Sequence, residues 1–442
     1  MEGHTTIIRT IDDVLDLRAV TTVFQPIVRL DPWQHDRREV VGYEALTRGP
    51  AGTPWEEPLR LFEAAAERGR LAELDWACRA GAYRAAIDAG LPPGLTLFVN
   101  AEPAALSEPC PPDLAPAILD AQLRLRVVTE MSERAVGGDP AVPLAAAEAC
   151  RAAGWGVALD DVGAWPGSLS VLPFVQPDVV KLDRHLTQQP GGVFAARVVN
   201  AVAAYAERAG AAVLAEGIET REHLAAALGM GATLGQGWLF GRPGPLPDDV
   251  AGRTCSLAVP FVAPPAPSPD ARRPARAGQP GARSSRTGHS TPYEVVAARR
   301  PTAEATKRML LPLSRCLEAQ ALDPAEPPML LASLQEGGHF TPATARRYAA
   351  AAETAALVAV LGTELPGVPA PGVRGVALAS DDALRGEWNV IVVGPHFAGA
   401  LVARDLADAG PDAGRRFTYA LTYDRDLVLD AARALLHRIV PA

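Results

Sequence analysis

W-G-V-A-L-D-D at residues 155–161 and D-V-V-K-L-D at residues 178–183 are the stretches that decide the fold of this chain. Each is a short apolar run that ends in charged residues, which is typical of a buried parallel strand emerging at the rim of a sheet. The two adjacent aspartates of the first stretch would then stand at one strand end, and Lys181 near the end of the next. Ordinary solvation of strand ends is the alternative explanation of this pattern.

Lysine is rare in this chain, and one of its two lysines lies in the second stretch. Of 42 basic residues only Lys181 and Lys307 are lysines, so arginine supplies almost all of the positive charge. A lysine ammonium is a compact point charge whose pKa shifts readily on burial, whereas a guanidinium stays charged. Lys181 therefore indicates a position where an adjustable charge is needed, which favours a functional site over strand-end solvation.

The length and composition predict two or three domains. With 442 residues, 48% of them hydrophobic, the chain can bury large cores. The formal net charge of -9 argues against DNA binding, because phosphate contacts need excess positive charge. Five scattered cysteines without C-x-x-C spacing predict neither a disulfide framework nor a zinc site. Since no signal segment and no run of about eighteen apolar residues occurs, we expect a cytoplasmic protein without a transmembrane segment.

Extended runs alternate with helical patterns through the first part of the chain. Two helices are expected within residues 58–90, and others near residues 142–153, 193–209 and 221–228. Eight strands with mostly helical crossovers fit a TIM-like (β/α)8 barrel of the α/β class better than an open doubly wound sheet. The predicted strands are Val23–Leu30, Val40–Leu46, Leu95–Asn100, Leu123–Glu130, Val157–Asp160, Val179–Leu182, Ala212–Glu216 and Ala232–Phe240.

Polar side chains stand where most of these predicted strands end. In a barrel these ends converge on one face, which is the usual location of an active site. Seven strands that end in this way are hard to attribute to solvation alone. The residues concerned are Glu44, Asn100, Glu130, Asp160 with Asp161, Lys181 with Asp183, Glu216 and Gln236.

A cluster of five carboxylates at one end of a barrel requires positive charge. Two like charges about 4 Å apart repel by about 4 kcal/mol at an effective dielectric of 20, so the cluster must protonate, spread apart or bind cations. Oxygen ligands without a nearby histidine or cysteine favour hard ions such as Mg²⁺ or Mn²⁺. The sequence therefore predicts a hydrolytic site in which one aspartate bridges two divalent cations that act on a phosphoryl group.

An ordered series of motifs resembles the EAL-domain cyclic-di-GMP phosphodiesterases. The series opens with F-Q-P-I at residues 24–27 and Y-E-A-L-T-R-G at residues 43–49, and the resemblance covers about residues 17–247. It implies a TIM-like barrel that linearises cyclic di-GMP to pGpG with two divalent cations, Mg²⁺ or Mn²⁺. The later motifs are F-V-N at 98–100, E-M-S-E at 130–133, A-L-D-D-V-G at 158–163, K-L-D at 181–183, A-E-G-I-E-T at 215–220 and Q-G-W-L-F-G-R-P at 236–243.

The same resemblance implies roles for individual residues by their motif positions. Lys181 would hold and help to activate the attacking water, and Glu44 and Asp160 would be its catalytic neighbours in the metal site. The implied metal ligands are Glu44, Asn100, Glu130, Asp160, Asp161 and Glu216. The implied substrate contacts are Gln25, Arg48 and Gln236, and the implied supports that fix loops and ligands are Glu133, Asp183 and Glu219.

The loop after the paired aspartates departs from the family pattern. The family usually reads D-D-F-G-T-G-Y-S-S, whereas this chain continues V-G-A-W-P-G-S at residues 162–168. In the family this loop couples metal binding to dimer contacts and is tied down by the residue that matches Glu133. The chain keeps the metal ligands that the family uses in catalysis. The rate of catalysis, and its control through a homodimer of the barrel, are not determined by the sequence.

A change of composition separates the barrel from a second domain. Residues 248–292 are rich in Pro, Gly, Ser, Ala and Arg and predict a flexible linker between domains at residues 1–247 and 293–442. The second domain has a mixed α/β pattern with a single sheet. The predicted helices are Thr302–Leu322, Thr341–Leu361 and Asp426–Ile439, and the predicted strands are Met329–Leu334, Val373–Ala379, Trp388–Val393 and Phe417–Tyr423.

The second domain resembles the DICT sensory domain, a module found beside cyclic-di-GMP enzymes. The resemblance rests on segments such as M-L-L-A-S-L-Q-E at residues 329–336 and W-N-V-I-V-V-G-P-H-F at residues 388–397. The sequence thus predicts a cyclic-di-GMP phosphodiesterase that is regulated by a sensor for an unidentified ligand or protein. Two alternatives stay open, namely a catalytically weak barrel that acts as a cyclic-di-GMP receptor, and a protein-interaction scaffold.

Overall fold

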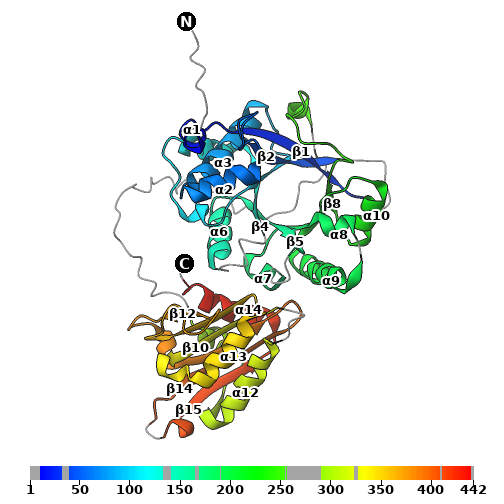
Figure 1. Cartoon of the computed structure of the whole chain (residues 1–442). Coiled ribbons are helices and arrows are strands. Elements are labelled where there is room, and N and C mark those ends of the chain that lie inside the picture. The colour runs from blue at the N-terminus through cyan, green and yellow to red at the C-terminus, as the bar shows by residue number, and fades with distance from the viewer. Residues whose placement is uncertain are drawn as a thin grey trace, which may run out of the picture. The chain divides into compact units, whose positions relative to one another are not determined.

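The computed structural model describes residues 10–31, 39–132, 141–164, 169–189, 191–253, 255, 290–322, 327–408 and 411–439. These residues form two compact units, one built on a closed barrel of eight strands and the other on a sheet of seven strands (Figure 1). The predicted barrel and the separate, smaller α/β domain are both confirmed. The predicted domain boundaries stay predictions, because most of the linker lies outside the described residues.

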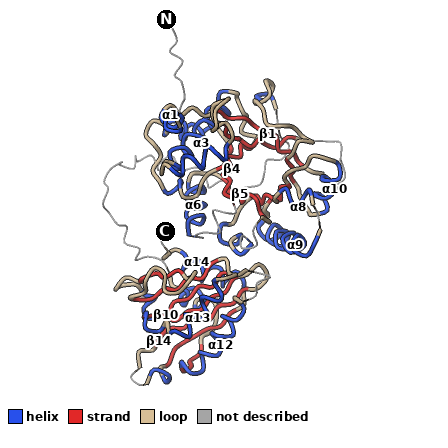
Figure 2. The backbone as a smooth tube through the Cα atoms, viewed as in Figure 1, coloured by secondary structure: helices blue, strands red, loops and turns tan. Residues whose placement is uncertain are grey.

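The barrel strands are neighbours in the order in which they occur in the chain. Figure 2 draws the strands in red and the helices in blue. Each predicted strand is present, with ends that differ by a few residues. The largest difference is at the last strand, which was predicted over Ala232–Phe240 and spans only three residues. The strands are β1 Thr21–Arg29, β2 Val40–Arg48, β3 Thr96–Asn100, β4 Arg126–Ser132, β5 Gly156–Val162, β6 Val179–Leu182, β7 Ala212–Ala215 and β8 Leu234–Gln236.

The first strand runs against the others. β1 pairs antiparallel with both β2 and β8, whereas successive pairs from β2 to β8 are parallel. A simple (β/α)8 repeat has eight parallel strands, and this direction of β1 was not visible in the sequence. The pairing sets Gln25 opposite Glu44 and Ile27 opposite Gln236, so β1 brings its glutamine beside the ends of two neighbouring strands.

An apolar layer fills the barrel interior, and charged residues lie two positions further along the same strands. Side chains at positions i and i+2 of a strand share one face. The buried interior cluster includes one such apolar residue on each of three neighbouring strands. The resulting pairs are Val128 and Glu130 on β4, Ala158 and Asp160 on β5, and Val179 and Lys181 on β6. The alternation of these strands therefore directs three charged side chains into the barrel, above its apolar layer.

Helices lie between the barrel strands in the sequence, as expected. The predicted helices near residues 142–153, 193–209 and 221–228 are confirmed as α6, α9 and α10, and the two helices within residues 58–90 are α2 and α3. In the described part of the chain, no helix is long and apolar enough to cross a membrane. The helices are α1 Ile11–Asp16, α2 Pro58–Glu67, α3 Leu71–Asp88, α4 Ala115–Arg124, α6 Ala141–Ala152, α7 Leu172–Val175, α8 Arg184–Gln188, α9 Gly192–Ala209 and α10 Arg221–Gly229.

The second unit is a mixed sheet in the order β12-β11-β10-β13-β14-β15-β9. The pairs β10–β11 and β11–β12 are parallel, and the remaining pairs are antiparallel. The sequence prediction missed β14, whose small residues resemble a loop. The strands are β9 Ala303–Thr306, β10 Met329–Glu336, β11 Leu357–Thr363, β12 Arg374–Ala377, β13 Glu387–Val393, β14 Ala398–Asp405 and β15 Arg416–Thr422.

Four α-helices in the described residues accompany this sheet, and α12 and α13 are several residues shorter than predicted. The predicted helix Thr302–Leu322 begins with strand β9, because Ala303–Thr306 pairs with β15. The predicted helix Thr341–Leu361 ends at Ala352, and its apolar end is strand β11, which pairs with β10. Buried residues of α12 and α13 share one core with one face of the sheet. The helices are α11 Pro292–Ala297, α12 Lys307–Gln320, α13 Pro342–Ala352 and α14 Arg425–Leu436.

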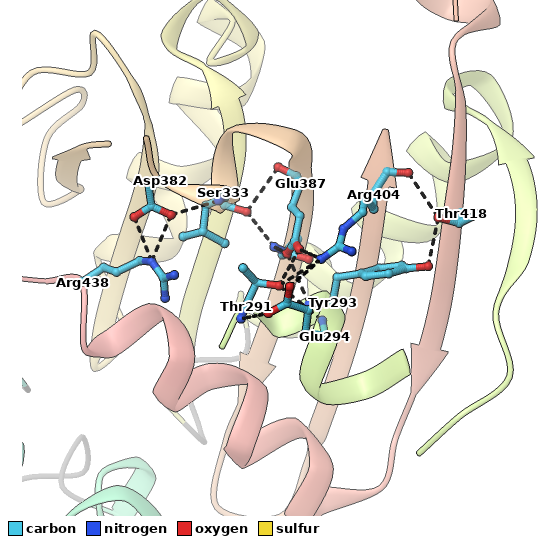
Figure 3. A network of polar contacts seen from close by, with 11 residues as sticks. Thr291, Tyr293, Glu294, Ser333, Asp382, Glu387, Arg404, Thr418 and Arg438 are labelled. Carbon is cyan, nitrogen blue, oxygen red and sulfur yellow. Dashed lines mark hydrogen bonds and ion pairs between the residues drawn. The ribbon is translucent and has the colours of Figure 1, made fainter. Parts of the chain in front are cut away.

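A buried carboxylate holds the first helix of this unit against the sheet (Figure 3). Glu387 of β13 is fully buried. One of its oxygens accepts from the hydroxyl of Thr291 at 2.5 Å and from the guanidinium of Arg404 at 2.9 Å. The other accepts from the backbone N–H of Tyr293 at 3.3 Å and from the amide of Asn389 at 3.1 Å. This network therefore satisfies its carboxylate with donors and a cation from within the domain.

Candidate active site

Lys181 lies at the centre of the charged end of the barrel. Its side chain is fully buried, and its ammonium nitrogen is within 4 Å of four carboxylates. The carboxylates come from four different strands or strand ends, so the closure of the barrel brings them together. The distances from Lys181 Nζ are 2.9 Å to Glu130, 2.9 Å to Glu216, 3.0 Å to Asp160 and 3.7 Å to Glu44.

An irregularity at the end of β5 places two adjacent aspartates on the same side. The register between β5 and β6 shifts between Leu159 and Val162, as in a β-bulge. Asp161 has a left-handed backbone with φ of 59°, which is uncommon outside glycine, and its N–H donates to Asp160 Oδ1 at 2.9 Å. Consecutive side chains of a regular strand point to opposite faces. The bulge allows both carboxylates to approach a single ion.

Two sets of carboxylates have oxygens close enough to share a metal ion. Glu44, Glu130 and Asp160 form one set, and Asp160, Asp161 and Glu216 form the other, with ligand oxygens within 4.8 Å of one another in each. Asp160 belongs to both sets. If all five carboxylates and Lys181 are ionised, the cluster carries four negative charges, which two divalent cations would neutralise. The donor set, made of oxygens alone, fits Mg²⁺ or Mn²⁺.

Amide side chains hold Glu44 from both sides. Asn100 donates Nδ2 to Glu44 Oε1 at 3.0 Å, and Gln236 donates Nε2 to Glu44 Oε2 at 2.5 Å. Gln236 Nε2 also lies 3.2 Å from Gln25 Oε1, and Gln25 donates to the carbonyl of Gly241 at 3.1 Å. Of the two glutamines expected to contact substrate, Gln236 therefore holds a candidate metal ligand and Gln25 holds Gln236.

The turn after β8 depends on a glycine. Gly237 has φ of 155°, and a side chain at this position would place its first carbon 2.2 Å from the carbonyl oxygen of Ile218. Only a residue without a Cβ permits this approach. The close contact fixes the strand end that carries Gln236.

Burial and mutual repulsion raise the pKa values of three carboxylates in the cluster. Burial raises the pKa of Glu130 well above its usual value, and the neighbouring Glu44 adds to the rise. Burial likewise raises the pKa of Asp160, and it raises the pKa of Glu216 to about 8 with help from the charge of Asp160. Without cations the cluster therefore retains protons near neutral pH.

Glu44 and Lys181 stay charged, because their attraction to opposite charges and hydrogen-bond partners outweighs the effect of burial on their pKa values. Burial alone would raise the pKa of Glu44, but the Lys181 charge and the hydrogen bond from Gln236 outweigh it and lower that pKa. Burial disfavours the ammonium of Lys181, but the surrounding carboxylates, Asp160 first among them, raise its pKa well above the usual value. In the absence of metal ions, Lys181 is thus the cation that holds these carboxylates together.

The remaining predicted site residues lie at the edge of this cluster or outside it. Arg48 ends β2 and donates to the carbonyl of Thr47 at 2.7 Å. Asp183 caps α8 by accepting from the N–H of His185 at 2.7 Å. Glu219 accepts from Gln188 Nε2 at 3.4 Å. Glu133, the predicted support of the loop, lies outside the described residues.

Two contacts around the site were not anticipated. Gln188 of α8 donates to the carbonyl of Gly217, directly after Glu216, at 3.0 Å. Asp75 of α3 accepts from the N–H of Glu102, two residues after Asn100, at 2.9 Å. The sequence contained a signal for Asp75, which is an acidic residue inside an otherwise apolar helical pattern. It contained no signal for Gln188, because this residue lies on a short polar helix.

Curated relatives match parts of the barrel. The chain is 35% identical over 126 residues to the cyclic di-GMP phosphodiesterase RocR of Pseudomonas aeruginosa, a match that covers 27% of this chain and 31% of RocR. It is 30% identical over 220 residues to an uncharacterized signaling protein of Caulobacter vibrioides, which covers 47% of this chain and 26% of that protein. Each match thus spans less than a third of the relative's own length.

Solved structures of similar barrels contain the dinucleotide. The manganese and cy-diGMP complex of Klebsiella pneumoniae BlrP1 has 30% sequence identity and a TM-score of 0.44, and the match covers 51% of this chain and 56% of that one. The c-di-GMP complex of the phosphodiesterase PaMucR has 24% identity and a TM-score of 0.45, with 53% and 96% covered.

Family models match both units. The DICT domain, described as a sensory domain in diguanylate cyclases and two-component systems, matches residues 294–406. The EAL domain matches residues 8–243, which is more than half of the chain and contains every described residue of the cluster around Lys181. The chain therefore belongs to the EAL-domain family and carries a DICT domain after its barrel.

Proposed function

We propose that the barrel is a metal-dependent phosphodiesterase that hydrolyses cyclic di-GMP to linear pGpG. The observation that carries this proposal is the gathering of five carboxylates and one lysine at one end of an EAL-family barrel, in two sets that share Asp160. The substrate is supported by the relative RocR, which is named a cyclic di-GMP phosphodiesterase.

The proposed metal ligands divide between the two sets. Two divalent cations, Mg²⁺ or Mn²⁺, would stabilise charge on the phosphoryl oxygens and lower the pKa of a water molecule. Asn100 would contribute its Oδ1 atom, because its Nδ2 already donates to Glu44. The ligands would be Glu44, Asn100, Glu130, Asp160, Asp161 and Glu216.

Lys181 would hold the attacking water and accept its proton. Its raised pKa depends on the surrounding carboxylates. If bound cations neutralised these carboxylates, the ammonium would lose its partners and gain positive neighbours, and both changes would lower its pKa. Lys181 would then be a general base next to Asp160, at a point where proton transfer assists attack on phosphorus.

Three further side chains would bind the nucleotide. Gln236 Oε1 is buried and has no hydrogen-bond partner among the described residues, so it can accept from an N–H of the ligand. Arg48 carries a guanidinium, whose planar donors match phosphate oxygens. Gln25 would join Gln236 once the ligand replaces their mutual hydrogen bond. Asp183 and Glu219 would support the strand ends and loops next to these groups.

A cyclic-di-GMP receptor with weak catalysis is the second candidate. The observation that favours it is the sequence after Asp161, where V-G-A-W-P-G-S replaces the F-G-T-G-Y-S-S of the family. A loop that no longer communicates with the metal site could leave binding intact and slow turnover.

Incubation of the purified chain with cyclic di-GMP and Mg²⁺ or Mn²⁺ tests the proposal. We expect pGpG to form and to disappear in Glu44→Ala, because this substitution removes a ligand of the first carboxylate set. Glu63→Ala, which removes an exposed glutamate from α2, is the matched control and should retain activity. Tight binding without turnover would support the receptor instead. Absence of nucleotide binding would overturn both the phosphodiesterase and the receptor, and the protein-interaction scaffold would then be the remaining candidate.

The second domain would sense an unidentified ligand or protein and regulate the barrel. This role rests on the DICT match. The homodimer through the barrel and the cytoplasmic location expected from the sequence stay predictions. Sedimentation of the purified chain, with and without cyclic di-GMP, tests the homodimer directly.

A further inference from the structure

An ion pair is buried inside helix α3, away from the cluster around Lys181. Asp75 is 2% exposed and Arg79 is fully buried. Arg79 Nε donates to Asp75 Oδ2 at 2.7 Å, and Nη2 lies 2.6 Å from the same oxygen. The spacing of four residues places the two side chains on one face of the helix.

The surroundings make this ion pair costly to bury. Trp76, Ala77 and Ala80 of the same helix belong to an apolar core cluster, and the Arg79 guanidinium lies 3.7 Å from the centre of the Trp76 ring. Arg79 Nη1 is buried without a hydrogen-bond partner among the described residues. Replacing such a pair with apolar residues is often neutral or stabilising. Stability of the helix alone therefore does not explain why charges occupy these positions.

The second oxygen of Asp75 indicates what the pair does. Asp75 Oδ1 accepts from the backbone N–H of Glu102 at 2.9 Å. The N–H of the preceding residue, Ala101, donates to the carbonyl of Glu130 at 2.9 Å. The two residues that follow Asn100 are thus anchored one after the other, first to the neighbouring strand and then to α3.

We propose that Asp75, oriented by Arg79, is a positioning residue that sets the direction of the Asn100 side chain at the end of β3. Asn100 donates Nδ2 to Glu44 at 3.0 Å, which leaves its amide oxygen for the proposed metal ion. Without the anchor on Glu102, the strand end could rotate and carry this oxygen away. The inference rests on the proposed function, because it gives Asn100 the role of a metal ligand.

Two double variants, both of which remove the charges of Asp75 and Arg79, separate the positioning role of Asp75 from the effect of its charge. Asp75→Leu with Arg79→Met removes both charges and the acceptor for the Glu102 N–H. Asp75→Asn with Arg79→Met removes both charges but keeps a side-chain oxygen that can accept from this N–H. Calorimetric titration with Mn²⁺, together with electron paramagnetic resonance of the bound ion, measures affinity without depending on turnover.

We expect Mn²⁺ binding to weaken about tenfold or more in the leucine variant, as is common when a partner of a metal ligand is lost, and about twofold at most in the asparagine variant. In an Asn100→Ala background the two double variants should bind Mn²⁺ equally, because Asp75 acts through Asn100. Equal affinities in the original background would overturn the inference. If the unchanged chain binds no Mn²⁺, the proposed function fails and the inference fails with it.

Hydrogen exchange in the unchanged chain tests the anchor where a double variant does not fold. The Glu102 amide should exchange as slowly as the amides of β3, because its hydrogen is bound to a buried carboxylate. Exchange at the rate of an exposed loop would overturn the proposal regardless of the variants.

Discussion

Both units contain a buried carboxylate network, and the two networks are balanced differently. Glu387 in the second unit faces one arginine and three neutral donors, all supplied by the domain itself. In the barrel, Lys181 is within 4 Å of four carboxylates, three of which have raised pKa values. The Glu387 carboxylate has its partners within the domain, whereas the barrel cluster has an excess of negative charge.

This difference separates a structural role from a binding role. A buried charge that is paired and fully hydrogen-bonded fixes the geometry of a fold, as Glu387 does for the start of α11. A buried cluster that needs protons or cations binds them from outside, and its properties depend on pH and metal. The predictions below test this contrast at each network.

The largest expected effect is on turnover, in Lys181→Met. Loss of the proposed base should reduce pGpG formation by about 10²–10⁴-fold, a range usual for general base catalysis. Mn²⁺ should bind as tightly as before or more tightly, because the ammonium that competes with the cations is gone. Single-turnover assays and Mn²⁺ titration measure the two quantities separately.

Lys181→Arg is the matched control, since it keeps the positive charge but does not deprotonate. It should also be slow. Full activity in Lys181→Arg would contradict the proposed role of Lys181, and a loss of Mn²⁺ binding in Lys181→Met would assign the lysine to the structure of the site instead.

A large effect on stability is expected in the second unit, in Glu387→Ala. Removal of this carboxylate leaves the Tyr293 N–H without its acceptor and leaves Arg404 with Glu294 as its carboxylate partner. Because the Arg404 side chain is 40% exposed, the expected cost is that of unsatisfied buried donors, about 1–3 kcal/mol. The free energy of unfolding of the second unit, measured with urea, should fall by this amount. Divalent cations should not restore it.

Glu387→Gln keeps the shape and one acceptor oxygen, so its loss should be smaller. If Glu387→Ala were as stable as the unchanged chain, Glu387 would not hold α11 against the sheet. The structural role that we assign to this carboxylate would then be wrong.

The sequence allowed the prediction of the barrel and of most residues around Lys181, because both depend on local patterns. Glu130, Asp160 and Lys181 each stand two residues after an apolar interior residue, so strand alternation alone directs them inward. The contacts of Gln236 with Glu44 and with Gln25 could not be predicted, since they depend on the antiparallel direction of β1 and on the closure of the barrel.

The second unit was harder to predict, for reasons visible in two segments. The alanine-rich residues after α13 contain no proline or glycine to mark the helix end, so β11 was assigned to the helix. β14 reads A-G-A-L-V-A-R-D, with few β-branched or aromatic residues, and it is a strand because β13 and β15 pair with it on both sides.

The smallest expected effect, taken per pH unit, is the pH dependence of the barrel cluster. The pKa of Glu216 is raised from 4.5 to about 8, so between these values the folded chain holds a proton that the unfolded chain has lost. Without metal, the stability of the barrel should therefore fall as pH rises from about 5 to 8, by up to about 1.4 kcal/mol per pH unit for one such proton. Thermal unfolding in the presence of a chelator measures this slope.

Metal binding should show the opposite trend, because cations displace these protons. The apparent affinity for Mn²⁺ should rise across the same pH range, and Glu216→Gln should flatten the slope of stability by removing one titrating group. Without metal, Lys181 stays charged throughout this range, since the neighbouring carboxylates raise its pKa. If the stability and the Mn²⁺ affinity of the barrel did not change between pH 5 and 8, groups of the barrel itself would balance the negative charge of the cluster, as they do for Glu387 in the second unit. The two networks would then differ in their location but not in their function.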